Sequence, residues 1–157
     1  MAGRVSTLIL AIIIIGVLGF MGYNVYGEYV AARNIKAEIL DVSIDRIGLT
    51  SSDISFKLKF TNPTGYGTPI FWIDSYSIYI NDHYVGSGTL PQTRIPANST
   101  IYKTTKITLE HAKVSEGVVS AVRAGKFTLT IEGVIEARIL LSTIPIFIQF
   151  SATYVYG

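Results

Sequence analysis

The N-terminal part of the chain contains 23 consecutive residues without a charge, residues 5–27. Within this stretch, residues 8–21 read LILAIIIIGVLGFM and are almost wholly apolar. A helix needs about 20 apolar residues to cross a hydrocarbon core of about 30 Å, at a rise of about 1.5 Å per residue. Amphipathic rings that favour the membrane interface follow at Tyr23, Tyr26 and Tyr29. The stretch therefore predicts one N-terminal transmembrane helix, with an anchor over residues 1–27 and a domain over residues 28–157.

A cleavable signal peptide is the alternative interpretation of this segment. Such a peptide has an apolar core of about 7–15 residues and small residues at its cleavage site. Residues 8–20 fit the core, and Val30-Ala31-Ala32 resembles a cleavage site. However, that site lies well past Phe20, beyond Glu28 and several tyrosines, which favours a retained anchor. A type IV pilin-like leader would place a basic residue beside its cleaved glycine, and Met1-Ala2-Gly3 has none.

The charges at the two ends of the stretch bear on its orientation and on the partners of the chain. Arg4 and the terminal amine lie directly at one end, whereas Arg33 and Lys36 lie several residues beyond the other. Because Lys and Arg beside a span favour the cytoplasmic side, we expect the N-terminus inside and the domain outside. From Glu28 onward, 12 basic and 11 acidic residues are scattered without a basic block. We therefore expect membrane lipids as the anchor's partner and no nucleic acid, while the oligomeric state stays open.

Beyond the anchor, apolar and polar residues alternate with a period of two, which is typical of half-buried β-strands. The alternation is unbroken over residues 53–60, and it changes face near Leu40, which predicts a β-bulge. Asn81-Asp82-His83 predicts the tight turn of a hairpin. Seven or eight such strands, with turn signals about 8–12 residues apart, predict an all-β sandwich or barrel.

Residues 111–124 depart from this β-pattern. Val114, Val118 and Val122 recur every four residues, and Gly125 follows at a position where helices often end. The segment predicts one short helix, although valine is a poor helix former.

The sequence predicts no catalytic, metal or cofactor site and no enzyme. His83 and His111 have no neighbouring ligand at metal-binding spacing, and we interpret both as exposed polar residues. A Gly-x-Ser-x-Gly nucleophile motif is missing. Gly86-Ser87-Gly88 has no following helix whose N–H groups would bind phosphate, so we expect a strand end there. Asn98 begins an Asn-Ser-Thr glycosylation acceptor, which is relevant if the domain is extracytoplasmic.

Several short motifs occur in a fixed order along the domain. Asn62-Pro63 ends an apolar strand, and Val85-Gly86-Ser87-Gly88, Ile95-Pro96-Ala97 and a Thr-rich strand over residues 101–109 follow. Gly133 and Ile144-Pro145 continue the series toward the C-terminus. Over residues 35–154 the series resembles the group 2 late embryogenesis abundant family, also known by its water-stress and hypersensitive-response (WHy) domain. Thr64 departs from the pattern, since the family often has a second Asn there.

The resemblance implies an immunoglobulin- or fibronectin-III-like antiparallel β-sandwich with one short helix. It also implies a non-enzymatic role, without a cofactor, linked to desiccation or stress protection. We interpret the signature residues as structural, because Pro ends a strand and an Asn amide bonds the turn that follows it. These residues are Asn62, Pro63, Gly86, Gly88, Pro96, Gly133 and Pro145.

These observations give a leading hypothesis and two alternatives. The leading hypothesis is a membrane-anchored, non-catalytic stress-protection or interaction domain, displayed at the membrane surface against other surface proteins. The first alternative is lipid binding or handling in an apolar groove between the sheets. Its mouth would be lined by Phe71, Trp72, Tyr154 and Tyr156. The second alternative is a structural subunit of a surface assembly, joined through exposed strand edges.

Overall fold

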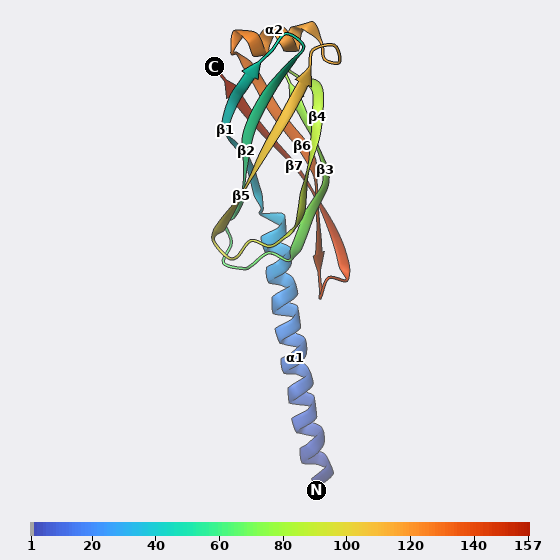
Figure 1. Cartoon of the computed structure of the whole chain (residues 1–157). Helices are drawn as coiled ribbons and strands as arrows, with labels where there is room; N and C mark the ends of the chain where they lie inside the picture. The colour runs from blue at the N-terminus through green and yellow to red at the C-terminus, as the bar shows by residue number, and fades with distance from the viewer. Residues whose placement is uncertain (1) are drawn as a thin grey trace.

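The computed structural model describes residues 2–157 and forms a long helix followed by a strand-rich domain (Figure 1). The helix is α1 (Ala2–Arg33). The domain then contains β1 (Lys36–Ile47), β2 (Ser51–Asn62), β3 (Ile70–Ile80), β4 (His83–Thr93), β5 (Ser99–Glu110), α2 (Glu116–Ala124), β6 (Phe127–Ile139) and β7 (Ile144–Tyr156).

The strands form two antiparallel sheets that pack face to face. One sheet has the order β1-β2-β5 and the other the order β4-β3-β6-β7. Both sheets contribute aliphatic and aromatic side chains to one core between them. α2 lies across the end of the sandwich that is farthest from α1 (Figure 1). The structure therefore confirms the predicted fold class, an antiparallel β-sandwich with one short helix behind a long apolar N-terminal helix.

The strands β1 and β2 show how the alternation in the sequence sets the register. Every second residue of β2 from Ser52 to Asn62 is buried, so one face of the strand lines the core. In β1 the register with β2 shifts after Leu40, and Asp41 adopts a positive φ of 52°. This shift is the predicted bulge, and it lets both halves of β1 direct apolar side chains inward.

The hairpin of β3 and β4 turns through Asn81 and Asp82, whose φ angles are 48° and 65°. Two successive positive φ values define the turn type that matches the twist of paired strands, and Asn and Asp tolerate it best among side-chain-bearing residues. The predicted turn is confirmed. The expected strand end at Gly86-Ser87-Gly88 is wrong, because β4 continues through these residues to Thr93. Likewise, β6 is one continuous strand through Gly133.

Two glycines make room for a tyrosine in the four-stranded sheet. Tyr76 on β3 lies opposite Gly88 on β4 and Gly133 on β6. A Cβ atom at Gly88 would overlap the Tyr76 ring, and one at Gly133 would come within 2.9 Å of both Tyr76 and Phe150. The buried Tyr76 hydroxyl reaches across the sandwich to the Thr105 hydroxyl at 2.9 Å. Burial raises the pKa of Tyr76, so the hydroxyl stays neutral and joins the two sheets by a hydrogen bond.

Helix α2 confirms the predicted short helix but begins later than residue 111. Ser115 precedes its first turn and accepts a hydrogen bond from the Val118 amide at 3.3 Å, as an N-cap does. Gly125 ends it with a φ of 69°. Val118 and Val122 are buried against the sandwich, so packing stabilises a helix whose valines have low intrinsic propensity.

Helix α1 has two parts with different surroundings. Its apolar residues up to Phe20 are largely exposed; Leu8, Ile15 and Phe20, for example, are 62%, 69% and 71% exposed. Its last turns are packed on the sandwich, where Ala31 and Ala32 are fully buried. The helix continues past the expected domain boundary at Gly27 and ends at Arg33. Among residues 2–157, it is the helix that is long and apolar enough to cross a membrane.

Candidate functional site

The structure brings three turns together with the last turns of α1, at one end of the sandwich (Figure 1). We call this region the near end; it comprises residues 63–69, 94–98 and 140–143 and the part of α1 that contacts them. We call the opposite region, with turns 48–50 and 81–82 and helix α2, the far end. Since the near end is where the helix meets the domain, it is the region that sets how the domain sits relative to α1.

Asn62 holds two of the near-end turns together. Its side chain is fully buried. The Nδ2 group donates to the carbonyls of Tyr66 at 2.6 Å, Pro96 at 3.1 Å and Ile95 at 3.2 Å. Its Oδ1 atom accepts hydrogen bonds from the Thr64 amide at 3.1 Å and the Thr64 hydroxyl at 2.7 Å. A buried carbonyl without a partner is costly, so this amide stabilises both turns at once.

The turn that Asn62 shapes presents Tyr66 to α1. The Tyr66 ring makes edge-to-face contacts with Tyr23 and Tyr26, with ring centroids 5.7 and 6.2 Å apart. Gly27 lies directly beneath the ring, where a Cβ atom would come within 2.6 Å of it. The neighbouring Tyr23, and next burial, raise the pKa of Tyr66. A neutral aromatic cluster therefore joins the domain to the helix.

The third near-end turn, between β6 and β7, is bonded to α1 through a carboxylate. The Leu140 amide donates to Glu28 Oε2 at 3.2 Å. Between the helix and this turn lies an apolar cleft of about 310 Å³. It is lined by Phe20, Met21, Asn24, Val25, Glu28, Leu140 and Leu141. The β6–β7 hairpin thus runs alongside α1 at the level of Phe20 to Glu28.

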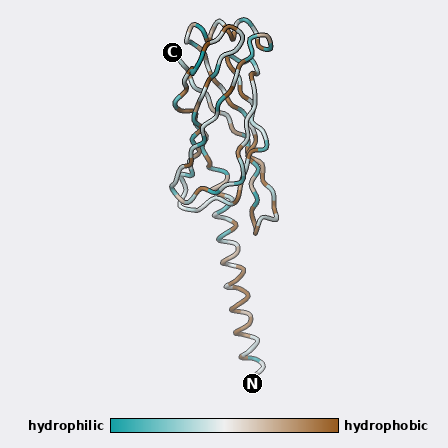
Figure 2. The backbone as a smooth tube through the Cα atoms, in the orientation of Figure 1, coloured by the Kyte–Doolittle hydropathy of each residue, from teal (hydrophilic) through white to brown (hydrophobic). Residues whose placement is uncertain are grey.

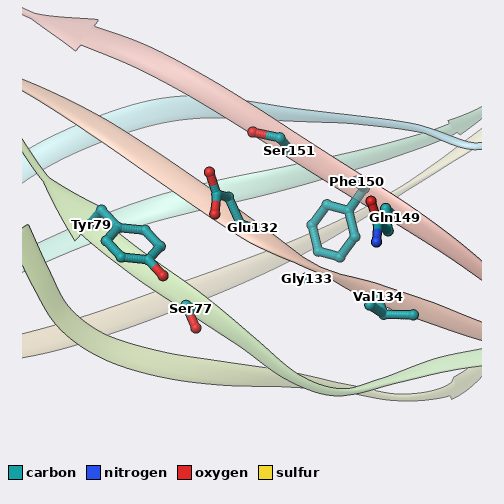
Figure 3. A pocket seen from close by; sticks show the side chains of 8 residues that line it. All are labelled: Ser77, Tyr79, Glu132, Gly133, Val134, Gln149, Phe150 and Ser151. Atoms are coloured by element: carbon teal, nitrogen blue, oxygen red, sulfur yellow. The ribbon is translucent and has the colours of Figure 1, made fainter. Parts of the chain in front are cut away.

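A second, shallower hollow of about 600 Å³ crosses β3, β6 and β7 (Figure 3). Its lining includes hydroxyl, amide and carboxylate groups, and the Phe150 ring lies beside Gly133. The lining residues are Ser77, Tyr79, Glu132, Gly133, Val134, Gln149, Phe150 and Ser151. Glu132 is the one carboxylate among these eight, and none of the other seven is a histidine, lysine or arginine. The hollow therefore does not offer the paired groups that general acid–base chemistry needs.

The four aromatic residues expected at the mouth of a lipid groove do not lie together. Phe71 is fully buried in the core. Trp72, its neighbour on β3, points to the other face, where the Arg138 guanidinium lies 5.9 Å from its ring centroid. Tyr154 and Tyr156 pair with Leu129 and Phe127 at the far end, and Tyr156 stacks on Phe127 at 4.9 Å. The structure therefore does not assemble these side chains into one surface.

The remaining signature residues lie in several parts of the fold. Gly86 is on β4 opposite Ile78, and Pro145 is on β7 opposite Arg138. Pro63 and Pro96 are exposed in the two turns that Asn62 joins. Asn98, the candidate glycosylation residue, is exposed in the same region with a φ of 52°, and its amide donates to the Thr64 carbonyl at 2.9 Å.

The two histidines differ from each other. His83 is exposed at the start of β4, as expected. His111 is not a simple exposed residue, because its ring bridges the buried Ser52 hydroxyl at 2.8 Å and the Leu49 carbonyl at 3.1 Å. A carbonyl only accepts, so Nδ1 carries the proton in that bond. Sequence reasoning missed this structural role, since Ser52 and His111 are 59 residues apart and only the pairing of β2 with β5 joins them.

Comparisons with known proteins support the fold. No family model and no curated protein matches the sequence. Among solved structures, the Arabidopsis thaliana protein AT1g01470 matches with a TM-score of 0.56 at 14% identity, covering 78% of this chain and 80% of that one. A candidate late embryogenesis abundant protein matches with a TM-score of 0.39 at 16% identity, covering 94% of this chain and 82% of that chain. An Archaeoglobus fulgidus protein matches with a TM-score of 0.39 at 12% identity, covering 76% and 95%.

The chain thus shares its sandwich fold with the Arabidopsis thaliana protein AT1g01470. At such low identity the likeness concerns the fold alone. What the domain does must be argued from its own residues and from its attachment to α1.

Proposed function

We propose that this protein is a single-pass membrane protein that displays a non-catalytic sandwich of the late embryogenesis abundant group 2 type. Residues 1–27 are a retained anchor with the N-terminus in the cytoplasm, and the domain of residues 28–157 lies outside. There it protects or contacts other surface proteins under stress. The proposal joins the membrane anchor to the stress-related, non-enzymatic role implied by the motif series.

The observation that carries the proposal is the change of surroundings along α1. The apolar side chains between Val5 and Phe20 are largely exposed around the whole helix. A helix that is apolar all round suits lipid as its solvent. The same helix continues into the fully buried Ala31 and Ala32. Cleavage after Ala32 would remove Tyr23, Tyr26 and Glu28, which contact the near end, and this supports retention of the anchor.

The lining of the two hollows on the domain surface supports a non-catalytic role. The hollow across β3, β6 and β7 contains a single carboxylate, and the cleft beside α1 is lined mainly by apolar groups and Glu28. Among residues 2–157, no group of three His, Asp or Glu side chains is placed to hold a metal ion. Such a surface suits contact with other molecules better than a reaction.

The first experiment tests the anchor. The full chain is expressed, membranes are washed with alkaline carbonate, and the intact mass of the retained protein is measured. We expect the full-length mass in the membrane pellet. The double variant Ile12→Lys with Ile15→Lys should leave the pellet, whereas Tyr84→Lys with Tyr102→Lys, which adds the same charge to exposed domain residues, should stay. A mass that begins at Arg33 would mean a cleaved signal peptide.

The second experiment tests protection. The full chain in lipid vesicles is dried and rehydrated with an equimolar client enzyme, and the recovered client activity is compared with that from empty vesicles. We expect a higher recovery in the presence of the protein. An equal recovery would remove the protective role and leave an anchored domain that acts only by binding.

A further inference from the structure

The β6–β7 hairpin exposes apolar side chains on both of its sides. Leu141 at its tip is 85% exposed, and Phe147 on β7 is 61% exposed. Ile144 and Val134 are exposed by 43% and 42%. No charged residue occurs anywhere from Ile139 to the C-terminus. An exposed apolar turn and strand without a charge, on the surface of a domain, usually mark a contact with a partner or a membrane.

The position of the hairpin tip relative to α1 indicates which partner this is. Leu140 and Leu141 line the cleft beside Phe20, Met21 and Asn24. A span that begins after Arg4 and needs about 20 residues at about 1.5 Å each to cross about 30 Å ends near Asn24. The tip therefore lies at the level where the hydrocarbon core of the bilayer meets the headgroups.

The turn itself combines strain with an exposed leucine. Leu140, Leu141 and Ser142 adopt positive φ angles of 52°, 53° and 63°. Gly or Asn would adopt these angles at lower cost, because the left-handed region brings the Cβ atom of other residues too close to the backbone. The Thr143 amide bonds the Ile139 carbonyl at 3.0 Å, and the Leu140 amide bonds Glu28, so these backbone groups are satisfied before any lipid is met. Leu141 thus occupies a strained position at which its apolar side chain is exposed rather than buried.

The Arg138–Pro145 strand pair, next to the last pair before the turn, carries residue types that suit the headgroup layer. Trp72 and Arg138 stack there, and the Arg138 guanidinium also lies 3.4 Å from Glu136. Trp favours the interface, where its ring is apolar and its N–H stays wet, and an Arg side chain extends toward phosphate. Apolar residues in the turn and an amphipathic pair directly behind it therefore match the change from hydrocarbon to headgroups at the surface of one leaflet.

We propose that the tip of the β6–β7 hairpin, through Leu141 and Ile144, inserts into the outer interface of the bilayer that α1 spans. This gives the domain a second membrane contact and holds the sandwich at a fixed inclination to the membrane. The inference rests on the proposed anchoring by α1. It adds a lipid-facing surface that belongs to the domain itself.

The test uses the full chain reconstituted in phosphatidylcholine vesicles. Because the chain has no cysteine, a single Cys can carry an environment-sensitive fluorophore. Leu141→Cys reports the hairpin tip, and Leu18→Cys reports the anchor. Leu49→Cys is the matched control, since Leu49 is a 93% exposed turn leucine at the far end. Each label is measured with and without lipids that carry a nitroxide near the headgroup.

We expect the label at position 141 to shift its emission to the blue and to lose fluorescence to the nitroxide, while the label at position 49 does neither. If the label at 18 is quenched but those at 141 and 49 behave alike, the hairpin does not enter the bilayer and the anchor stands. If none of the three is quenched, the anchoring itself is wrong and the inference falls with it. All labels carry the same dye, so the dye's own affinity for lipid does not produce the expected difference.

Discussion

The near and far ends of the sandwich are stabilised by different kinds of interaction. The far end uses charged and titratable groups, such as the Arg46–Asp53 ion pair at 3.1 Å, the Lys113–Glu110 pair at 2.9 Å and the His111 bridge. The near-end turns contain one charged residue, Arg94; the Asn62 amide and the Tyr66 ring hold two of these turns, and Glu28 of α1 accepts a hydrogen bond from the third. Each end also presents an exposed turn leucine, Leu49 at the far end and Leu141 at the near end.

This difference in charge agrees with the two environments that an anchored domain would meet, water at the far end and the membrane surface at the near end. Ion pairs at an exposed end are solvated by water and cost little to keep there. Near a bilayer, an uncompensated charge is expensive, whereas neutral amides, hydroxyls and aromatic rings are tolerated. The near end of the sandwich adjoins α1, and Figure 2 shows the apolar colouring of this helix below the domain. The predictions below alter one end at a time.

The largest effect is expected for Asn62→Ala at the near end. The substitution leaves the carbonyls of Tyr66, Ile95 and Pro96 without their shared donor in a buried site. We expect a loss of about 3 kcal/mol in the free energy of unfolding, measured by urea titration of the full chain in micelles. Thr61→Ala, one residue earlier on the outer face, is the control and should cost less than about 0.5 kcal/mol. Equal effects of the two variants would mean that the Asn62 bonds do not stabilise the turns.

His111→Ala should be the largest single change at the far end, yet smaller than Asn62→Ala. It removes the partners of two groups, the buried Ser52 hydroxyl and the Leu49 carbonyl. Asn62→Ala, in comparison, removes the partner of three carbonyls and a backbone amide. We expect a loss of about 1.5 kcal/mol in the same urea titration. His83→Ala, at an exposed position on β4, should change little. A loss as large as that of Asn62→Ala would contradict the ranking of the two ends.

The sequence predicted the strands well where buried and exposed residues alternate. It did not predict the hydrogen bonds that join residues far apart in the chain. In β2 the alternation of Ile54, Phe56, Leu58 and Phe60 corresponds directly to one buried face. Contacts such as Glu28 with Leu140 join residues 112 positions apart, and only the assembled sandwich brings them together. No local pattern carries that information. The length and composition of the apolar stretch predicted the first part of α1. They did not predict that the helix continues past the charged Glu28 and ends at Arg33.

The four residues expected at the mouth of a lipid groove do not lie together, and part of the reason can be read from the sequence. Phe71 and Trp72 are adjacent on one strand, and successive side chains of a strand point to opposite faces. If Trp72 faces solvent, Phe71 must therefore point into the core. Tyr154 and Tyr156 share a face of β7, but they lie seven or more strand positions from the Trp72–Glu136 pair, at the other end of the sheet. The register that separates them becomes visible only in the paired sheet.

Tyr66→Ala should loosen the helix without unfolding the sandwich. The ring contacts of Tyr66 with Tyr23 and Tyr26 are edge-to-face pairs, each worth about 1 kcal/mol. We expect faster amide hydrogen exchange in the last turns of α1, while exchange in β2 and β6 stays unchanged. Tyr84→Ala is the matched control, because Tyr84 makes the same kind of pair with Tyr79 at the far end, with centroids 6.1 Å apart. If both variants leave α1 unchanged, the aromatic cluster does not couple the domain to the helix.

The smallest effect should be a pH dependence that belongs to the far end. The hydrogen bond from Thr108, and then that from Arg46, lowers the pKa of Asp53 below its ordinary value. A carboxyl whose pKa is lower in the folded state contributes stability above its unfolded pKa and loses it as the pH falls through the folded value. The urea midpoint of the wild type should therefore fall between pH 5 and pH 3, about the range in which carboxylates titrate. The midpoint of Asp53→Asn should fall less steeply. Because the cationic partners Arg46 and Lys106 are exposed, added salt should reduce the difference between the two proteins at pH 5. Asp74→Asn, at an exposed position on β3, is the control. If the urea midpoint of Asp53→Asn followed the wild-type pH curve, this carboxylate would not cause the loss of stability in acid. The difference in charge between the two ends would then have no measurable effect on stability.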